Sequence, residues 1–197
     1  MKKIQTALIS VFNKVNLVPV LRVLEEYNVD IVSTGGTYDY IKTYGYKNTY
    51  SSEEFTGMPP ILGGRVKTLH PKIFGGILYR RDDFQDSEDI KSHEIRPIDL
   101  VIVDLYPFHD AVTEGESKAE IIEKIDIGGV SLLRAAAKNY KDVVSVPSRH
   151  HYDDLIKTMK NSEGHTSEES RQYFAKETFE VTTSYDWYIS KWFKGNR

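Results

Sequence analysis

The sequence predicts an α/β fold in which a parallel sheet is flanked by helices. Two apolar, β-branched runs, at residues 3–12 and 29–33, are each followed by a stretch with helical spacing. A third run, "IDLVIVDLY" at residues 98–106, is the strongest strand signal in the chain. Because strands of a parallel sheet are covered on both faces, they appear as continuous apolar runs that alternate with helices.

The helix after the first strand is expected within residues 14–28. Leu17, Leu21 and Leu24 recur there at helical spacing. Pro19 fits the first turn of this helix, where a backbone N–H group has no partner within the helix.

The remaining elements follow from the same patterns. In chain order they are a strand at 29–33, a turn at 34–37 with a short helix up to Tyr44, a solvated helix and loop at 82–96, a strand at 98–106, helices at 117–125, 128–139 and 150–160, and a strand at 142–147. From residue 167 to about 192 the aromatic residues have helical spacing, which favours a terminal helix packed on the sheet or on a partner. No repeat or shift in composition is evident, so we expect one domain over residues 1–197.

The composition limits the classes of function. With 40% hydrophobic and 28% charged residues the chain is of ordinary globular type, and its net charge of -3 gives no general attraction to nucleic acid or to an anionic membrane. The absence of cysteine excludes disulfide and thiolate chemistry. Residues 1–3 are similar to the start of a signal peptide, but no cleavage site follows, so we expect a cytoplasmic protein. No stretch approaches the length of about 18 apolar residues that a membrane span needs.

Serine, threonine, glycine and one lysine are found where the first two predicted strands end. They are Ser10 and Lys14 after the first strand, and Ser33, Thr34, Gly35, Gly36 and Thr37 ("STGGT") after the second. Hydroxyl groups, a cation and glycines that permit close backbone approach suit a phosphate monoester at a helix N-terminus. Taken alone, "STGGT" is equally a glycine turn capped by threonine. Neither a dinucleotide-binding glycine motif nor a P-loop is present, which argues against NAD and against ATP hydrolysis.

The decapeptide "GGRVKTLHPK" at residues 63–72 concentrates positive charge in a segment that glycine and proline keep out of regular structure. Arg65, Lys67, His70 and Lys72 are its potential cations. Such a loop either faces solvent or receives an anion, and the residues by themselves leave both interpretations open.

Two further segments carry candidate residues. Tyr106 in "DLYPF" follows the strongest strand, and it is either a ligand-binding side chain or a turn aromatic packed on the core. Asp126 precedes Gly128 and Gly129, whose N–H groups would open a helix as an oxyanion or phosphate site, unless Asp126 is only an N-terminal cap. Lys138 lies roughly 18 Å of helical rise beyond Asp126. The two residues therefore meet only if the segment folds back or a partner subunit supplies one of them.

Taken together, "SVFNK", "STGGT", "LGGRVKTLHPKIFGGIL", "DLYPF" and "IDIGGVSLLRAAAKN" closely resemble the N-terminal inosine monophosphate (IMP) cyclohydrolase domain of the bifunctional purine biosynthesis family. The resemblance extends from Ile4 to the terminal "YDWYISKWF". It implies a three-layer, methylglyoxal-synthase-like fold and closure of the formylated aminoimidazole carboxamide ribotide to IMP with loss of water. It also implies a homodimer and a reaction without metal or cofactor. Independently, the histidines are scattered along the sequence and give no sign of a metal site.

The resemblance also assigns roles to individual residues. The ribotide phosphate would be held by Ser10, Lys14, Ser33, Thr34, Gly36 and Thr37. Lys67 would form an oxyanion hole with N–H groups near Gly128 and Gly129, and Arg65 and Thr68 would line the pocket. The carboxamide would be oriented, and its protons moved, by Tyr106, Asp126 and Lys138.

The sequence departs from the family pattern at three points. Phe12 and Asn13 stand where a small or aromatic residue and an aspartate are common, and Phe74 stands where a histidine is usual. The formyltransferase domain that forms the second half of the family's proteins is absent, so we expect a chain that consumes the formylated ribotide without making it.

Two alternatives are weighed beside the cyclohydrolase. Methylglyoxal synthase shares a similar phosphate motif, but "RVKTLHPK" and "IDIGGVSLLRAAAK" belong to the cyclohydrolase resemblance. A non-catalytic nucleotide sensor, like the related domain of carbamoyl phosphate synthetase, would need only the phosphate-binding residues. The presence of Lys67, Tyr106, Asp126 and Lys138 together argues against a sensor.

Overall fold

The computed structural model describes residues 1–195 and confirms the α/β class. Its centre is a five-stranded parallel sheet with the order β4-β3-β2-β5-β6. The strands are β2 (Thr6–Val11), β3 (Asp30–Ser33), β4 (Thr49–Ser51), β5 (Leu100–Asp104) and β6 (Val144–Val146). A separate antiparallel pair joins β1 (Lys2–Lys3) to β7 (His165–Thr166) near the N-terminus.

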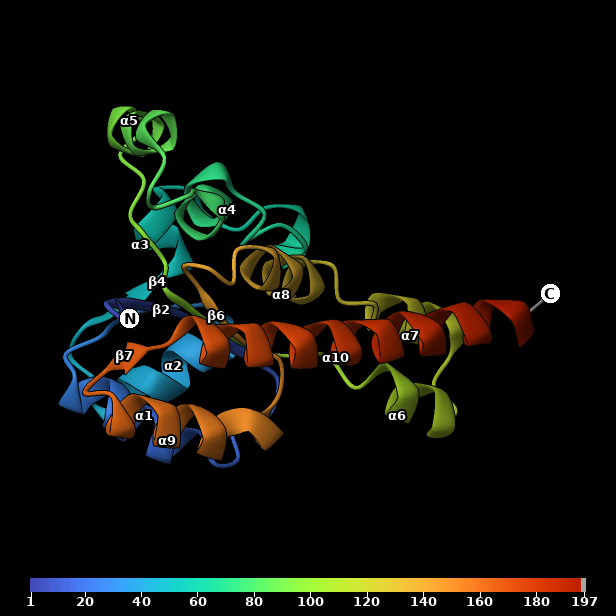
Figure 1. Ribbon diagram of the computed structural model, residues 1–197. Helices are drawn as coiled ribbons and strands as arrows, with labels where there is room; N and C mark the ends of the chain where they lie inside the picture. Colours follow the sequence, from blue (N-terminus) through green and yellow to red (C-terminus); the bar gives the residue numbers. More distant parts are fainter. Residues whose placement is uncertain (196–197) are drawn as a thin grey trace.

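Helices cover both faces of the sheet and make three layers (Figure 1). One face is covered by α1 (Leu17–Glu26), α2 (Gly35–Tyr44) and α9 (Tyr152–Asn161), and the other by α3 (Ser52–Thr56), α4 (Pro71–Leu78) and α8 (Gly128–Lys138). The other helices are α5 (Phe84–Ser92), α6 (Phe108–Thr113), α7 (Lys118–Glu123) and α10 (Glu168–Gly195), with short 3-10 turns η1 (Leu62–Gly64) and η2 (Arg149–His151).

The apolar strand residues divide between two cores because successive side chains of a strand point to opposite faces. Ile9 and Ile102 pack with α1 and α9, whereas Leu8 and Val101 pack with α4 and α8. All four side chains are fully buried. This is the two-sided burial that the continuous apolar runs predicted.

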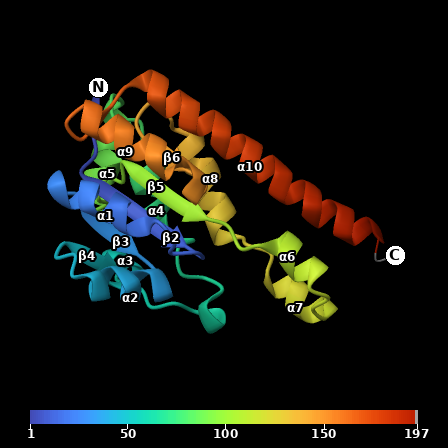
Figure 2. The same cartoon turned by 90° about the horizontal axis from the view of Figure 1, so that it is seen from below.

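A third, smaller core lies beyond the sheet. Phe108 of α6, Ile121 of α7 and Tyr185 of α10 pack together there. Figures 1 and 2 show α6, α7 and the C-terminal half of α10 side by side, extending away from the strands. The aromatic terminal helix thus packs against α8 and β6 with one half and against this small core with the other.

Element boundaries differ from expectation where the pattern was short or weak. The first strand is confined to β2, because Lys2 and Lys3 pair with β7 instead. Among the elements that were not predicted are β4, α3, α4 and α6, which have three, five, eight and six residues and give too little periodicity to detect. Residues 82–96 do contain the expected solvated helix, α5, which has no buried residue.

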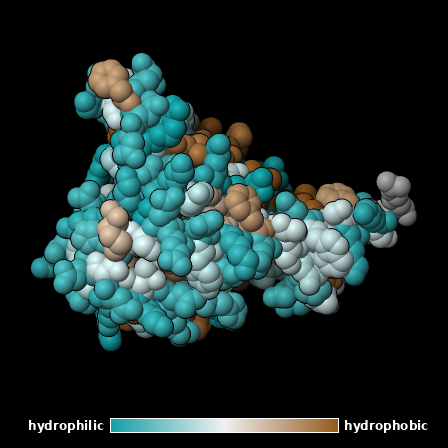
Figure 3. Space-filling model, in the orientation of Figure 1, coloured by the Kyte–Doolittle hydropathy of each residue, from teal (hydrophilic) through white to brown (hydrophobic). Residues whose placement is uncertain are grey.

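The surface is that of a globular domain. The face shown in Figure 3 is mainly hydrophilic, with scattered apolar side chains. Within residues 1–195, no helix is both long and apolar enough to cross a membrane.

Candidate functional site

The order in which strands are added to the sheet reverses at β2. From β2 the chain adds β3 on one side and β5 on the other. In open α/β sheets, the crevice at the carboxyl ends of two such strands is where ligands bind. Helix α2 follows β3 on one face, and the first residues of α8 lie beside Val103 near the end of β5 on the other. Two helix N-termini therefore approach this crevice from opposite faces.

The "STGGT" segment is joined to β2 by its hydroxyl groups. Ser10 Oγ and Thr34 Oγ1 are 2.9 Å apart, which brings the two predicted phosphate segments together. Ser33 donates to the carbonyl of Ile9, and Thr37 donates to the carbonyl of Val11 and accepts its N–H. These two hydroxyls are thus used within the protein, and Ser33 is fully buried, so they hold the turn in position.

The first turn of α2 leaves backbone donors for a ligand. Gly35 and Gly36 are its first residues, and both are exposed. N–H groups in the first turn of a helix have no acceptor within the helix, and they carry a partial positive charge. Gly35 has a φ of 45°, a conformation that glycine adopts without strain.

The loop after β2 is fastened to the end of β5. The N–H of Asn13 donates to Asp104 Oδ2 at 3.0 Å, and the amide oxygen of Asn13 accepts the N–H of Val15. Lys14 donates to the carbonyl of Phe12. A carboxylate is therefore present beside position 13, supplied by the neighbouring strand. Burial raises the pKa of Asp104, although this hydrogen bond and the nearby Lys14 oppose the shift.

The loop predicted to carry cations is ordered by its own backbone. Ile61 and Val66 form an antiparallel bridge around a turn in which Gly63 and Gly64 have φ of 65° and 89°, values that favour glycine. His70 accepts the N–H of Lys72 through Nδ1 and so caps α4. This capping role accounts for the histidine at position 70 without any contact to a ligand.

The same loop reaches the start of α8 and the end of α7. Thr68 is buried, and a Cβ at Gly128 would lie 3.0 Å from its Oγ1. Arg65 is exposed and pairs with Glu123. Thr68 therefore lines the N-terminus of α8, whereas Arg65 is directed toward α7.

Asp126 is a half-buried acid that binds the first turn of α8. Its Oδ1 accepts the N–H of Gly129 at 2.7 Å. Burial raises the pKa of this carboxyl group, opposed by the Gly129 hydrogen bond, the positive charge of Lys67 and a hydrogen bond from the Tyr106 N–H. The structure thus brings Asp126, Lys67 and Tyr106 into one neighbourhood. The Gly129 N–H is already occupied, which leaves Gly128 as the donor of the predicted pair without a partner among residues 1–195.

Tyr106 links the two halves of the site. Its ring packs on Phe12, from the loop beside Lys14, with centroids 4.4 Å apart. Its backbone contacts Asp126 on the other side. The Lys124 ammonium donates to its hydroxyl at 3.5 Å. Contacts therefore extend from the loop beside Lys14 through Tyr106 to Asp126, and the charge of Lys67 acts on Asp126.

Lys138 does not join this group. Helix α8 is continuous from Gly128 to Lys138, so the segment does not fold back, and the exposed Lys138 lies at the opposite end of the helix, roughly 15 Å of rise away. The alternative in which the segment folds back is therefore wrong. A role for Lys138 beside Asp126 requires a second copy of the chain.

Three residues near the site were not among the candidates. They are Asp104, Lys124 and Tyr185. Asp104 had a detectable signal, since it ends the strongest strand directly before Leu105 and Tyr106. Lys124 and Tyr185 had none, because their contacts with Tyr106 and Asp126 arise only from the packing of α7 and α10. Phe74, at the position where histidine is usual, packs against the core beneath α8.

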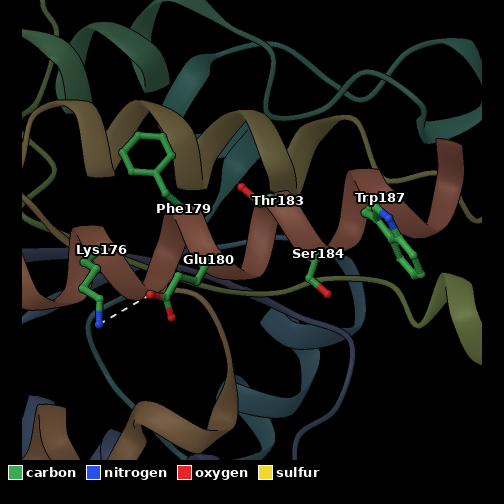
Figure 4. Close-up of a pocket in the computed structure, with 6 residues that line it drawn as sticks. All are labelled: Lys176, Phe179, Glu180, Thr183, Ser184 and Trp187. Atoms are coloured by element: carbon green, nitrogen blue, oxygen red, sulfur yellow. Dashed lines mark ion pairs between the residues drawn. The ribbon is translucent and has the colours of Figure 1, made fainter.

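Metal binding and a second surface hollow are two further possibilities for a site. Among residues 1–195 no group of three or more His, Cys, Asp or Glu residues could hold a metal ion. A hollow of about 690 Å³ lies on the surface of α10, between Phe179 and Trp187 (Figure 4). Its lining includes the ion pair of Lys176 and Glu180 and none of the candidate residues, so it is separate from the crevice.

The fold and the crevice define an α/β domain of the methylglyoxal-synthase (MGS) type. The family model described as MGS-like domain matches residues 16–131, and the one described as AICARFT/IMPCHase bienzyme matches residues 136–197. The chain belongs to the MGS-like domain family, and its C-terminal third matches that bienzyme family.

Named relatives agree with this assignment. The chain is 52% identical over 192 residues to the bifunctional purine biosynthesis protein PurH of Bacteroides thetaiotaomicron, covering 98% of the chain and 38% of that protein. It is 46% identical to PurH of Rippkaea orientalis, covering 95% and 36%. The chain thus spans little more than a third of these relatives. The crystal structure of ForH matches with a TM-score of 0.82 and 31% identity, over 96% of this chain and 97% of that one.

Proposed function

We propose that this chain is an IMP cyclohydrolase, which closes the formylated aminoimidazole carboxamide ribotide to IMP with loss of water. The observation that carries the proposal is the arrangement of Ser10 and Thr34 beside the loop of Phe12, whose ring packs on Tyr106, and of Tyr106 beside Asp126, on whose carboxyl group the charge of Lys67 acts. One end of this arrangement suits a phosphate, and the other suits a developing oxyanion. The names of the PurH relatives and of the bienzyme family support the same reaction.

At the phosphate end we assign binding to groups that remain available. These are the N–H groups of Gly35 and Gly36, the ammonium of Lys14, which keeps donors beyond its bond to Phe12, and the hydroxyls of Ser10 and Thr34, one of which donates to the other so that one hydroxyl proton remains. A phosphate monoester is stabilised by a helix N-terminus because of the unpaired donors and the partial positive charge there. Ser33 and Thr37 contribute indirectly, since their hydroxyls fix the turn against β2.

At the reacting end the carboxamide nitrogen attacks the formyl carbon, and the formyl oxygen becomes an alkoxide. Lys67 and the Gly128 N–H would stabilise this oxygen more in the transition state than in the substrate. Asp126 would accept a proton from the nitrogen, and its raised pKa makes it a stronger base than an ordinary carboxylate. The alkoxide takes up one proton to give a carbinolamine. A second proton on this oxygen, matched by loss of the proton of the former formamide nitrogen, then lets it leave as water while the carbon–nitrogen double bond of the pyrimidine ring forms. Thr68 would line the pocket beside Gly128.

The arrangement of the whole protein is a further part of the proposal. Residues 1–197 would form a single cyclohydrolase domain that acts in the cytoplasm as a homodimer. The homodimer gives Lys138 a route to a site, because this lysine is exposed at the far end of α8 from Asp126. No metal or cofactor is required by the chemistry described above. Arg65, which pairs with Glu123, keeps a predicted role at the rim of the pocket.

The test is to supply the purified chain with the formylated ribotide and to follow purine ring formation by ultraviolet absorbance. We expect a rate far above that of the uncatalysed reaction. Binding of the ribotide without acceleration would instead favour a nucleotide sensor. Release of methylglyoxal from dihydroxyacetone phosphate, in a parallel assay, would favour a methylglyoxal synthase.

A further inference from the structure

Lys124 is held in a fixed position at the end of α7. It is the C-terminal cap residue of this helix, and its carbonyl accepts the hydroxyl of Tyr185 at 3.0 Å. The same hydroxyl accepts the N–H of Asp126 at 2.8 Å. Because Tyr185 is buried, one side chain of α10 fixes the backbone of Lys124 and of Asp126 together.

The side chain of Lys124 meets Tyr106. Its ammonium lies 3.5 Å from the Tyr106 hydroxyl and 4.8 Å from the centre of the ring. Glu116 balances its charge at 3.6 Å, and the second carboxylate oxygen of Glu116 is buried without a hydrogen-bond partner among the described residues. Phe12 contacts the same ring at 4.4 Å. Tyr106 is therefore restrained by a cation at the end of α7 and by an aromatic ring from the loop after β2.

The direction of the hydrogen bond matters for the reaction. An ammonium group has only donors, so the Tyr106 oxygen must accept from Lys124. The phenolic proton is then left to donate to another group. We propose that Lys124 is a positioning residue that holds Tyr106 as a hydrogen-bond donor toward the ribotide. This proposal rests on the cyclohydrolase function and adds to it a residue that carries no role in the sequence pattern.

The kinetic test replaces Lys124 by methionine, which has a similar shape and no charge. We expect Lys124→Met to lower kcat by roughly tenfold with little change in KM, because a misplaced catalytic group costs turnover more than binding. Lys124→Arg should restore most of the turnover, because it keeps a cationic donor. The matched control is Lys118→Met, which removes one charge at the exposed start of the same helix and should leave kcat unchanged.

A double-mutant cycle separates positioning from a general structural role. In a Tyr106→Phe background, Lys124→Met should have no further effect on kcat, because the hydroxyl on which it acts is gone. An equal loss in both backgrounds would overturn the proposal. It would also be overturned if Lys124→Met matched the Lys118→Met control in kcat.

A spectroscopic test does not depend on activity. With 3-fluorotyrosine incorporated throughout, the Tyr106 resonance is assigned by its loss in Tyr106→Phe. We expect Lys124→Met to shift this resonance in the ligand-free protein and Lys118→Met to leave it in place. No shift would mean that the contact is absent, which overturns the proposal. If the unaltered chain fails to close the ring although the shift is observed, the function fails and the contact stands.

Discussion

Gly129 is a residue at which the site has no room for a side chain. A Cβ at this position would lie 3.0 Å from Asp126 Cγ and 3.0 Å from Val103 Cγ1. The glycine thus allows the aspartate to lie directly against the first turn of α8, where it accepts the Gly129 N–H.

Gly129→Ala should therefore displace the carboxylate of Asp126 and lower both turnover and stability. We expect the free energy of unfolding to fall by about 1–3 kcal/mol, the range for overpacked positions. Gly36→Ala is the control for stability, because a Cβ there has nothing within 4 Å. Equal stability of the two variants in urea titrations would contradict the close packing at Gly129.

Replacement of Asp126 is expected to change the stability and the activity of the protein in opposite directions. Because burial raises its pKa above the ordinary 3.8, the folded chain binds this proton more tightly than the unfolded chain. The contribution of this group to the free energy of unfolding therefore falls as pH rises from 3.8 through the folded pKa, and it stays reduced above that.

Asp126→Asn removes this effect while keeping an oxygen that can accept the Gly129 N–H. We expect the variant to unfold at higher urea concentration than the unaltered chain at pH 7 and to lose this advantage toward pH 3.5. Each tenfold difference in proton affinity between the folded and unfolded chains corresponds to about 1.4 kcal/mol. Turnover should nevertheless collapse, because an amide is no base. A variant less stable than the original at pH 7 would contradict the cost assigned to the buried charge.

At the scale of elements, α10 stabilises the site from a distance in sequence. The Tyr185 hydroxyl donates to the carbonyl of Lys124 and accepts the N–H of Asp126, and burial raises its pKa to about 12. The terminal helix is thus coupled to the segment that leads from α7 into α8.

Tyr185→Phe should leave the carbonyl of Lys124 and the N–H of Asp126 without their partner. We expect a loss of about 1–3 kcal/mol in the free energy of unfolding, the cost of leaving buried polar groups unpaired. Tyr173→Phe, on the exposed part of the same helix, is the comparison and should change stability far less. Thermal unfolding of both variants checks this, and similar melting temperatures would contradict the coupling.

The elements themselves were largely predictable. The strands around Leu8 and Ile102 and the helix with Leu17, Leu21 and Leu24 follow from apolar periodicity, which burial on both faces of a sheet imposes. The proximity of the Ser10 and Thr34 segments was predictable for a related reason: residues that follow neighbouring parallel strands must meet at one edge.

The contacts between individual side chains were harder to predict from the sequence than the helices and strands. The contact of Asn13 with Asp104 joins residues 91 apart, and the one between Tyr185 and Asp126 joins residues 59 apart. No local pattern encodes such pairs, because they depend on how strands and helices are placed. The engagement of the Gly129 N–H by Asp126 was local and foreseeable, and it was considered as a capping alternative.

At the scale of the whole molecule, the position of Lys138 leads to a prediction about assembly. Since α8 is unbroken, a catalytic Lys138 has to act on the site of a second copy. Lys138→Ala and Asp126→Ala chains should each be inactive alone, and mixing them should therefore restore activity. In twofold dimers whose subunits exchange randomly, at most about a quarter of all sites would combine both intact residues.

Subunit exchange would first be confirmed with differently tagged chains. If mixed dimers form and no activity returns, Lys138 does not act across the interface. The predicted role of this lysine would then be withdrawn, while the roles of Lys67 and Asp126 would be unaffected.

If one crevice joins a phosphate site to an oxyanion site on Lys67, loss of this lysine should lower turnover more than it weakens binding. The most direct measurement compares Lys67→Ala with the unaltered chain for both turnover of the formylated ribotide and the Kd of IMP. We expect kcat to fall by about 100-fold or more, as for the loss of an oxyanion donor, while the Kd of IMP changes by less than about tenfold. Unchanged turnover, or a loss of binding that matches the loss of turnover, would contradict the claim.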